Sequence, residues 1–273
     1  MVTAAPVAPS SSAVSASSVV SALKFNTVEQ HPNDLGNAML MFREKGYAII
    51  TNVFERESVD AYLAQLKALI RPSSAWYAPY ELPLEDPLVL EPARAPRLRT
   101  AIRTGFAWER EKPSICLAQP GWLIKPANAD KRLVHDWHKD GDHWGMGSAN
   151  GGYQYPTWIH AAAYFTDMTL EHGPTFVIPR SHRDGSLSPY DPKGFHEEPF
   201  LPQKGDVVIW DQRAWHRAST RTVEGLRVMM NFAFFAVPMR DGEPLKPCAA
   251  MRQAYQDATD GRDKILFGGP YAL

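Results

Sequence analysis

Residues 133–144 read LVHDWHKDGDHW and bring together three of the nine histidines of the chain and three aspartates. His138 and Asp140 are two positions apart, so in an extended strand their side chains leave the same face and can bind one metal ion. The stretch also offers other possible metal-binding pairs, including the adjacent residues His135 with Asp136 and Asp142 with His143. It therefore predicts a metal site on a strand, with the choice of pair still open.

Short apolar runs separated by Gly, Pro, Asn and Asp surround this stretch from residue 114 onward. They are ICLAQ (115–119), WLIKP (122–126), WIHAAAYF (158–165), TFVIP (175–179), DVVIW (206–210) and LRVMMNFAFFAV (226–237). Repeated short strands with turn signals favour a sandwich or barrel, and no alternation of strands with helices suggests a parallel sheet. We therefore expect antiparallel β-structure in the second half of the chain.

The first half of the chain carries helical signals. Asp34 can cap a helix that runs through Lys45 and is ended by Gly46. Residues 47–54 are rich in β-branched and aromatic residues and predict a strand, and residues 55–70 return to helical apolar spacing. These elements predict an α+β chain that is mainly β, with flanking helices.

The segment 73–113 is irregular, rich in proline and both aromatic and basic. Its aromatic and basic residues include Trp76, Tyr77, Tyr80, Arg94, Arg97, Arg99, Arg103 and Trp108. Both a lid over a pocket and a solvated, partly helical crossover fit this composition. One more helix is expected over 249–257, before a loose terminus.

Length and composition bound the class of protein. The chain has 273 residues, 44% of them hydrophobic, which predicts one domain at 25–273 after a disordered tail at 1–24. Its formal net charge of -1 leaves no electrostatic footprint for nucleic acid or an anionic membrane. No apolar run approaches the roughly 20 residues of a transmembrane helix. We expect a small-molecule partner, no nucleic acid and no membrane, with a homo-oligomer left open.

Cysteine usage is sparse, with only Cys116 and Cys248 present. Two cysteines cannot form a multi-disulfide framework and suit a reducing compartment. We therefore expect a cytoplasmic protein.

Two ligands from one strand are too few for a stable mononuclear metal site. His216 is the best third candidate because it follows the apolar run DVVIW, where a barrel strand would end at the mouth. Two neutral imidazoles and one carboxylate form the facial set that holds Fe(II) and leaves positions open for a cosubstrate and oxygen. Zinc can occupy the same three groups.

A second feature at fixed spacing strengthens this interpretation. Arg227 lies eleven residues after His216, across a turn and on the next apolar strand. A guanidinium on a strand that lines a barrel needs an anionic partner, because burying an unpaired charge is strongly unfavourable. The carboxylate of a cosubstrate would bind it in a bidentate geometry that lysine does not reproduce.

Several motifs occur in a fixed order along the chain: KGYAIITNVFERESVDAYLAQL (45–66), WHKDG (137–141), GPTFVIPRSH (173–182), and KGDVVIWDQRAWH (204–216) followed by Arg227. In this order and spacing they resemble the phytanoyl-CoA dioxygenase-like family of Fe(II)- and 2-oxoglutarate-dependent oxygenases. The resemblance covers roughly residues 35–240. It implies the double-stranded β-helix of that family, a cupin-like jelly roll with flanking helices.

The resemblance also implies the roles of individual residues. His138, Asp140 and His216 fall on the iron ligands of the family, and Arg227 falls on the residue that binds the far carboxylate of 2-oxoglutarate. Thr175 matches a position that helps to hold the cosubstrate in many relatives. The ligand set thus selects one pair from the opening stretch.

Two positions depart from the family pattern. His135 stands where similar enzymes often have a Gln that contacts 2-oxoglutarate, so it is expected beside the cosubstrate. Ala218 stands where some relatives have a hydroxyl residue. Asp140, in contrast, is retained, and related halogenases generally lose this carboxylate, so the resemblance implies an oxygenase.

The activity implied is oxidation of a small organic substrate by Fe(II), O2 and 2-oxoglutarate, through hydroxylation, desaturation or a related C–H oxidation. The aromatic and basic residues of 73–113 favour a substrate from specialised (secondary) metabolism. Two alternatives stay open, a metal-dependent jelly-roll enzyme that does not use 2-oxoglutarate and a non-catalytic ligand-binding jelly-roll protein.

Four other polar residues have expected roles of their own. Ser181 and His182 are expected to form a structural turn. Asp211 is expected to accept a hydrogen bond behind a metal ligand. His160 lies on the run WIHAAAYF, where periodicity does not decide whether it points into the barrel or away from it.

Overall fold

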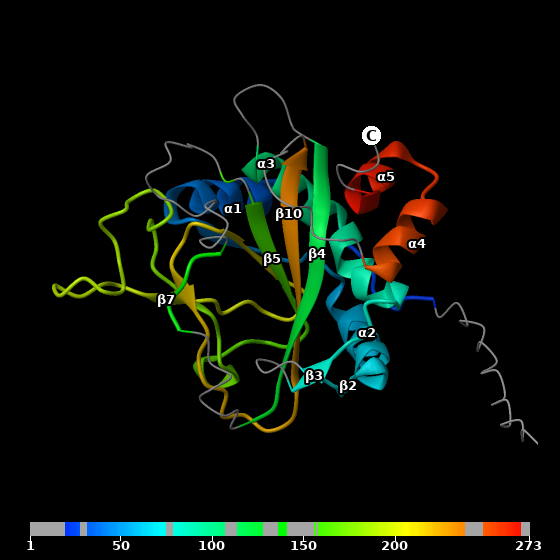
Figure 1. The fold of residues 1–273 in the computed structure, drawn as a ribbon, viewed down its shortest axis with the longest axis horizontal. Coiled ribbons are helices and arrows are strands. Elements are labelled where there is room, and N and C mark those ends of the chain that lie inside the picture. Colours follow the sequence, from blue (N-terminus) through cyan, green and yellow to red (C-terminus); the bar gives the residue numbers. More distant parts are fainter. Residues whose placement is uncertain are drawn as a thin grey trace, which may run out of the picture.

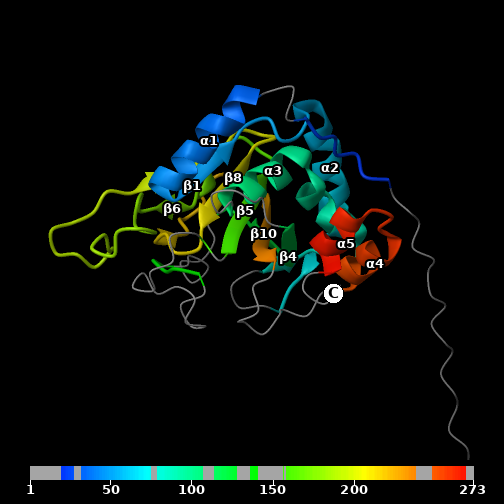
Figure 2. The ribbon, with the colours of Figure 1, turned by 90° about the horizontal axis from the view of Figure 1, so that it is seen from above.

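Helices cover one face of an antiparallel sheet in the computed structural model of the protein, and a smaller sheet packs on the other face (Figure 1, Figure 2). The structure describes residues 20–27, 32–74, 79–106, 114–127, 136–140, 156, 158–237 and 248–268.

The larger sheet has the strand order β1-β8-β5-β10-β4, and all its neighbouring strands are antiparallel. Its strands are β1 (Tyr47–Ile50), β8 (Val207–Asp211), β5 (Trp158–Tyr164), β10 (Arg227–Val237) and β4 (Ser114–Lys125). The antiparallel arrangement predicted from the sequence is confirmed. The register places His160 opposite Trp210 and Arg227 opposite Lys125.

The smaller sheet has the order β7-β6-β9. Its strands are β7 (Glu198–Pro199), β6 (Phe176–Val177) and β9 (His216–Arg217), and a separate ribbon joins β2 (Arg71–Pro72) to β3 (Tyr80–Glu81). Val177 and Phe200 share a core cluster with Val208 and Trp210 of β8, so the two sheets face each other. This is the predicted jelly roll, and it leaves the edge at β9 to receive the metal-binding segment.

The helices form the outer layer. They are α1 (Pro32–Lys45), α2 (Arg56–Leu69), the 3-10 helix η1 (Pro87–Arg94), α3 (Pro96–Gly105), the 3-10 turn η4 (Leu170–His172), α4 (Ala249–Asp257) and α5 (Gly261–Gly268). In α2, the buried residues Val59, Tyr62, Leu63 and Leu66 follow the spacing of one helical face. Seen from above, α1, α3 and α2 lie along one side of the strands (Figure 2).

Gly46 connects α1 to β1 and is required for two reasons. Its φ of 86° lies in the left-handed region, and its N–H donates to Phe42 O at 2.9 Å to end α1. A Cβ atom at this position would lie 2.5 Å from His182 Nδ1. The predicted stop signal is therefore also the place where the turn at 180–182 packs against the chain.

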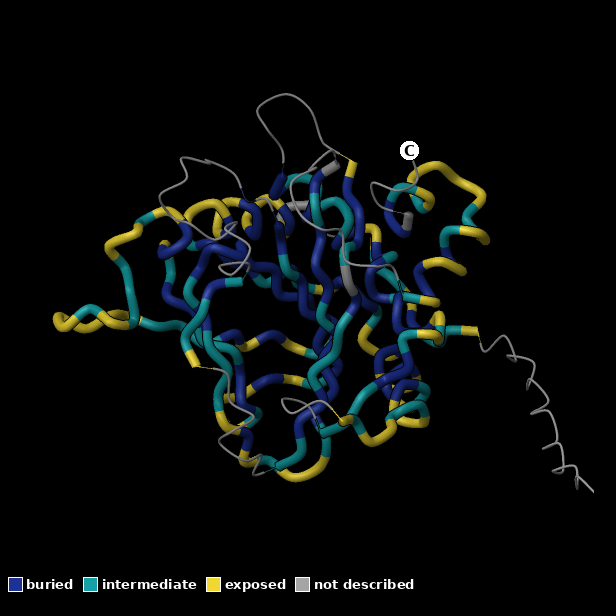
Figure 3. The backbone as a smooth tube through the Cα atoms, in the orientation of Figure 1, coloured by how far each residue is buried: buried dark blue, intermediate teal, exposed yellow. Residues whose placement is uncertain are grey.

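Two apolar cores lie on the two faces of the larger sheet. The extensive one packs the helices against Ile159, Ile209, Phe232 and their neighbours. The smaller one lies between the sheets and includes Tyr164 and Met229. Buried backbone runs through the central strands, whereas exposed backbone lies in the outer loops (Figure 3). Polar residues of the functional site therefore belong to the smaller core.

The described part of segment 73–113 is a packed layer and not a lid. Arg97 is wholly buried and donates to Thr27 O and Thr51 O at 3.3 and 3.2 Å. Arg94 and Arg99 both form ion pairs with Asp263 of α5. The partly helical crossover expected from the sequence is present, but Arg97 is buried in it, and Arg94 and Arg99 join it to α5. Trp76, Tyr77 and Trp108 lie outside the described residues.

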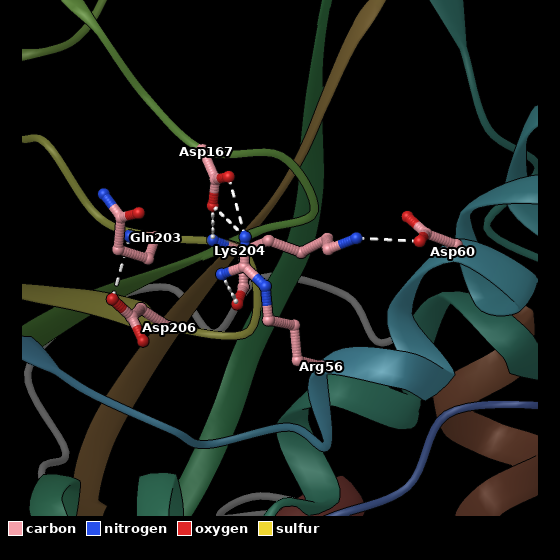
Figure 4. Close-up of polar contacts among 6 residues, drawn as sticks. All are labelled: Arg56, Asp60, Asp167, Gln203, Lys204 and Asp206. Carbon is pink, nitrogen blue, oxygen red and sulfur yellow. Dashed lines mark hydrogen bonds and ion pairs between the residues drawn. The ribbon is translucent and has the colours of Figure 1, made fainter.

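An exposed network of charged side chains ties α2 to two turns of the jelly roll (Figure 4). Arg56 Nη2 contacts Asp167 Oδ2 at 2.7 Å, and Lys204 Nζ contacts Asp60 at 2.7 Å. The Lys204 N–H donates to Asp167 Oδ1, and the Gln203 N–H donates to an oxygen of Asp206, both at 2.8 Å. Every carboxylate of the network has a donor within the network.

The two ends of the described chain also pack on the domain. Leu23 is buried, and Lys24 N–H donates to Ser58 Oγ at 3.0 Å, so packing already includes residues that the sequence pattern assigned to the tail. The helix α5 buries Leu266 and Phe267, and nearly all of the GGPYAL stretch expected to be loose lies outside the described residues. Among the described residues, no helix combines the length and apolar content that crossing a membrane requires.

Candidate metal centre

Three predicted metal ligands meet where residues 136–140 join the edge of the smaller sheet. His138 and His216 are linked by two backbone hydrogen bonds, each 3.0 Å long, and Asp140 N–H donates to Gln212 O at 3.0 Å. One ligand atom from each of His138, Asp140 and His216 lies within 4.8 Å of the other two. The bridge to β9 thus brings together residues that are far apart in the sequence.

Both histidines of this triad are oriented in the same way. His138 Nδ1 lies 2.7 Å from Asp136 O, and His216 Nδ1 lies 3.0 Å from Ala214 O. A carbonyl oxygen only accepts, so Nδ1 carries the proton in both rings and Nε2 keeps its lone pair. Both Nε2 atoms are therefore prepared to bind a cation.

The turn that carries His216 is stabilised from two sides. Arg213 forms an ion pair with Asp211 at 2.6 Å, and Asp211 Oδ1 also accepts from Arg213 N–H. Ser181 Oγ donates to Ile178 O at 2.7 Å and accepts from Trp215 N–H at 2.8 Å. The structural turn predicted at 181–182 is confirmed.

Asp211 does not have the role expected from the sequence. Its described hydrogen bonds go to Arg213 and not to a metal ligand. Because Asp211 ends β8, its carboxylate instead fixes the turn that leads to His216. It therefore acts on the site only through the backbone.

The electrostatics of the triad suit a divalent cation. Burial alone would raise the pKa of the Asp140 carboxyl, but the imidazoles of His160, His216 and His138 hold it well below its usual range. Burial lowers the pKa of His216, and Asp140 more than offsets this, so the net shift is upward. A metal ion would therefore compete with a proton at His216 in acid.

One observation tests directly whether the residues fit a metal. Asp140 Oδ2 is buried and accepts no well-formed hydrogen bond from the described residues, although His216 Nε2 lies 3.2 Å away. With Nδ1 protonated, this Nε2 has no hydrogen to donate. Two lone pairs and a carboxylate that converge without bonding one another fit a bound transition metal. The residues therefore fit the iron that the sequence resemblance implies.

His160 also reaches the triad, which settles the direction that periodicity left open. Its Nε2 is buried and lies 3.1 Å from Asp140 Oδ2, while 12% of the side chain is exposed. The imidazole stacks between Trp158 and Trp210, with 4.9 Å between ring centroids on each side. His160 therefore points into the jelly roll, onto the face that carries the metal site.

A cluster of buried cations lies on the same inner face. Arg227, Lys125 and Arg221 are exposed by only 3%, 4% and 3%. Arg227 Nη1 donates to Gly173 O at 2.5 Å, which holds the guanidinium beside the loop at 173–175. Among the described residues, no carboxylate pairs with any of the three cations. The cluster therefore has the charge and burial that suit a bound anion.

The cations also depress one another's ionisation. Burial, and then the charge of Arg227, lower the pKa of Lys125 to about 7. Burial lowers the pKa of Arg227 as well. Tyr164 lies beside Arg227, and the Thr175 side chain lies beside the Tyr164 hydroxyl. An anion bound here would meet two or three positive charges together with two hydroxyl groups.

The structure brings together most of the residues that the sequence singled out. His138, Asp140 and His216 converge, and Arg227 and Thr175 lie near Tyr164. Predictions for His135, Asp142 and His143 lie outside the described residues. Ala218 has no side chain that could replace the hydroxyl found in some relatives.

Lys125 and Arg221 were not found from the sequence. A signal for Lys125 existed, because it is the one charged residue in the apolar run WLIKP. What the sequence lacked was the register that sets Lys125 directly opposite Arg227. That pairing makes an isolated lysine part of an anion site.

A separate cavity of about 420 Å³ lies between α3, β4 and α5. Arg99, Arg103 and Ile115 are among its lining residues. Ile115 belongs to the core on the helix side of the sheet, whereas the triad lies on the other side. This cavity is therefore distinct from the candidate metal centre.

Solved structures of non-haem enzymes share this fold. SnoN, an α-ketoglutarate-dependent epimerase from nogalamycin biosynthesis, is 17% identical with a TM-score of 0.59, over 79% of this chain and 94% of SnoN. HygX from Streptomyces hygroscopicus, with nickel, 2-oxoglutarate and hygromycin B bound, is 17% identical with a TM-score of 0.56, over 76% and 89%. SnoK, an α-ketoglutarate-dependent carbocyclase from nogalamycin biosynthesis, is 18% identical with a TM-score of 0.56, over 81% and 96%. At this identity the likeness establishes the jelly-roll fold.

A family model provides the assignment beyond the fold. The model of phytanoyl-CoA dioxygenase (PhyH) matches residues 42–229, which is more than half of the chain. The matched region contains His138, Asp140, His216 and Arg227, the residues that the resemblance in the sequence had singled out. The chain therefore belongs to the phytanoyl-CoA dioxygenase family and is an Fe(II)- and 2-oxoglutarate-dependent oxygenase.

Proposed function

We propose that this oxygenase binds iron through His138, Asp140 and His216, binds 2-oxoglutarate through Arg227, and oxidises a small molecule of specialised metabolism. One observation supports the proposal most. A His-Asp-His set whose ligand atoms converge and a buried cation cluster with no carboxylate partner among the described residues occupy the same inner face. The His-Asp-His set suits a metal ion, and the cation cluster suits a dianion.

Iron would supply the activation of oxygen, coupled to conversion of 2-oxoglutarate into succinate and carbon dioxide. The chain supplies orientation and charge. Carbonyl anchors at Asp136 and Ala214 fix the two imidazoles, and the depressed pKa of Asp140 keeps its carboxylate ionised. A facial set of three protein ligands leaves the remaining positions for cosubstrate and oxygen.

The cosubstrate is held by charge and by burial. Arg227 binds the carboxylate of 2-oxoglutarate far from the iron, and Lys125 adds a second positive charge from β4. The hydroxyls of Tyr164 and Thr175 are placed to donate hydrogen bonds to the same anion. Because these groups are buried, water does not screen the interaction. His135 remains a proposed contact of the cosubstrate.

The substrate is proposed to approach from the side of His138. The side chain of His138 is 38% exposed, whereas that of His216 is 6% exposed. Trp137 makes an edge contact with Phe195, and the guanidinium of Arg217 lies over the Trp137 ring. Aromatic and cationic groups of this kind favour a ring-bearing substrate with polar substituents. Phe195 belongs to the loop at 183–197, which protrudes from the domain (Figure 1).

The neighbouring structures give this substrate class further support. SnoN has been solved with nogalamycin RO and HygX with hygromycin B, both of them small organic molecules. We propose hydroxylation, desaturation or a related C–H oxidation of such a molecule. We place the reaction in the cytoplasm, in keeping with the two free cysteines, Cys116 and Cys248.

Anaerobic addition of Fe(II) and 2-oxoglutarate, followed by oxygen, tests the proposal. Succinate release is measured with a panel of ring-bearing natural products. The wild-type protein is expected to bind one iron and to release succinate, with faster release when the panel contains a substrate. Asp140→Ala and His216→Ala are expected to lose detectable metal binding and turnover while keeping the circular dichroism of the wild type. Wild-type protein that binds no iron would disprove the site.

A further inference from the structure

His160 is a mostly buried titratable residue next to the triad, and the proposed mechanism does not use it. Its Nε2 is the described nitrogen closest to Asp140 Oδ2, at 3.1 Å. The ring N–H is not aligned on the oxygen, but the two atoms are close enough that a small rotation of the carboxylate would form an N–H···O hydrogen bond. This contact fits two different roles for His160, that of a further metal ligand and that of a residue that positions Asp140.

The number of coordination positions decides against a ligand. A 2-oxoglutarate-dependent centre needs open positions for both the cosubstrate and oxygen, and the facial triad already uses the rest. The ligand cluster of the described residues also contains His138, Asp140 and His216 without His160. A fourth protein ligand would block a position that the reaction requires.

The hydrogen-bond partners of the histidines support the same choice. His138 and His216 each direct Nδ1 to a backbone carbonyl, so in both rings Nε2 is the nitrogen without the proton and can coordinate a metal. No such carbonyl anchor holds His160 among the described residues, and its Nε2 faces a carboxylate oxygen. A neutral imidazole beside a carboxylate is most stable with the proton on the facing nitrogen. His160 is thus suited to donate, and the two triad histidines are suited to coordinate.

The ring of His160 is held in a fixed place. The planes of His160 and Trp210 are inclined by 12°, those of His160 and Trp158 by 21°, and the strand register sets His160 opposite Trp210. A ring packed between two indoles cannot turn away without moving one of them. The position of its N–H is therefore fixed by the central strand and by the two tryptophans, and it does not depend on the segment that carries Asp140.

We propose that His160 is a positioning residue for the metal centre, whose ring N–H restrains the Asp140 carboxylate through Oδ2. The inference rests on the proposed ligand set. His160 and Asp140 come from different parts of the jelly roll, β5 and the segment bridged to β9. Their contact fixes the ligand segment to the larger sheet. Outer contacts of this kind typically change metal affinity about 10- to 100-fold.

Three substitutions at position 160 separate the effect of the hydrogen-bond donor from the effect of the shape of the side chain. His160→Phe keeps an aromatic ring between the tryptophans but removes the donor. His160→Gln places an amide N–H at the reach of Nε2, and His160→Asn carries the same amide at a shorter reach, as a matched control. Dissociation constants for Co(II) are measured under anaerobic conditions, and thermal melts of the metal-free proteins report on folding.

Co(II) is expected to bind about 10- to 100-fold more weakly to His160→Phe and His160→Asn, and within about threefold of wild type to His160→Gln. Metal-free melting temperatures should not follow this order, because a purely structural role would not be restored by an amide of the right length. Unchanged Co(II) affinity in His160→Phe, with wild type still binding metal, would overturn this inference alone.

Pulsed EPR of the Cu(II)-loaded proteins counts the bound imidazoles. Two are expected in wild type and in His160→Gln. Three in wild type and two in the variant would make His160 a ligand and overturn the positioning role. Failure of wild type to bind any divalent metal, or undiminished binding by His216→Ala, would instead refute the proposed ligand set.

Discussion

Two clusters of polar side chains in this protein contrast sharply, the charged network beneath α2 (Figure 4) and the buried cluster of the metal centre. In the network, Arg56 meets Asp167 and Lys204 meets Asp60 in contact with water, so each of these four charges has a partner of opposite sign. In the buried cluster, Asp140 Oδ2 and His160 Nε2 are without a well-formed hydrogen bond, and Arg227 has no carboxylate partner among the described residues.

The difference separates structural charges from functional ones. Exposed ion pairs are screened by water and contribute little to stability, so they can be satisfied locally and exchanged without consequence. Buried polar atoms are normally satisfied within the protein, because leaving them unpaired is destabilising. Where the fold nevertheless leaves several of them together, a ligand completes the site. Three predictions test this contrast.

The largest effect is expected from Arg227→Ala. Truncating one partner of a buried charge pair costs about 2–5 kcal/mol, so the KM for 2-oxoglutarate should rise roughly a hundredfold or more. Metal affinity should stay as in wild type, because Arg227 does not contact the triad. Arg71→Ala, which removes an exposed ion pair with Glu81 on the β2–β3 ribbon, is the control and should leave this KM unchanged. An unaltered KM in Arg227→Ala would remove the cosubstrate assignment.

A smaller effect is expected from Lys125→Met, which should raise the stability of the ligand-free protein and weaken the binding of 2-oxoglutarate. In the unfolded chain the pKa of Lys125 is about 10.4, whereas in the folded protein it is about 7. Between these values the unfolded state binds more protons, so this residue makes the ligand-free protein more stable as pH rises from about 7 to about 10. Methionine at position 125 removes this dependence of stability on pH, and it also removes the cost of burying a charged group.

Thermal melts of ligand-free Lys125→Met should therefore exceed those of wild type at pH 7, and the difference should shrink toward pH 9. Binding of 2-oxoglutarate at pH 7 should weaken about tenfold, since a charged hydrogen-bond partner is lost. Lys67→Met, at an exposed position on α2, is the matched control and should change neither quantity. A lower melting temperature together with full cosubstrate affinity would show that Lys125 is only structural.

The smallest effect is expected from Arg56→Ala in the exposed network. Loss of this pair should lower the melting temperature by at most about 3 °C, and metal and cosubstrate binding should not change. Asp167→Asn tests the same contact from the other side. A large loss of stability in both variants would mean that the network, and not the apolar core, holds α2 in place.

Local patterns predicted elements well where one residue type marks an end. The helix expected over 249–257 is α4, and the stop expected at Gly46 ends α1. The runs ICLAQ and WLIKP, in contrast, form the single strand β4. Pro120 interrupts the sequence pattern, but β4 is an edge strand, where a missing N–H is tolerated. The helix α5 was missed although Asp260 caps it, with Asp263 N–H donating to its Oδ1 at 2.7 Å.

The sequence alone determined the antiparallel jelly roll, the family, and the residue types of the metal centre. Strand periodicity and motif spacing can be read along the chain without knowing which distant segments pair. The tertiary structure decided which polar residues share a face. The register set Lys125 beside Arg227 and turned His160 toward Asp140, and it directed Asp211 away from the metal. Cross-strand neighbours depend on pairing between distant segments, and a shift of one residue would reverse every one of these side chains.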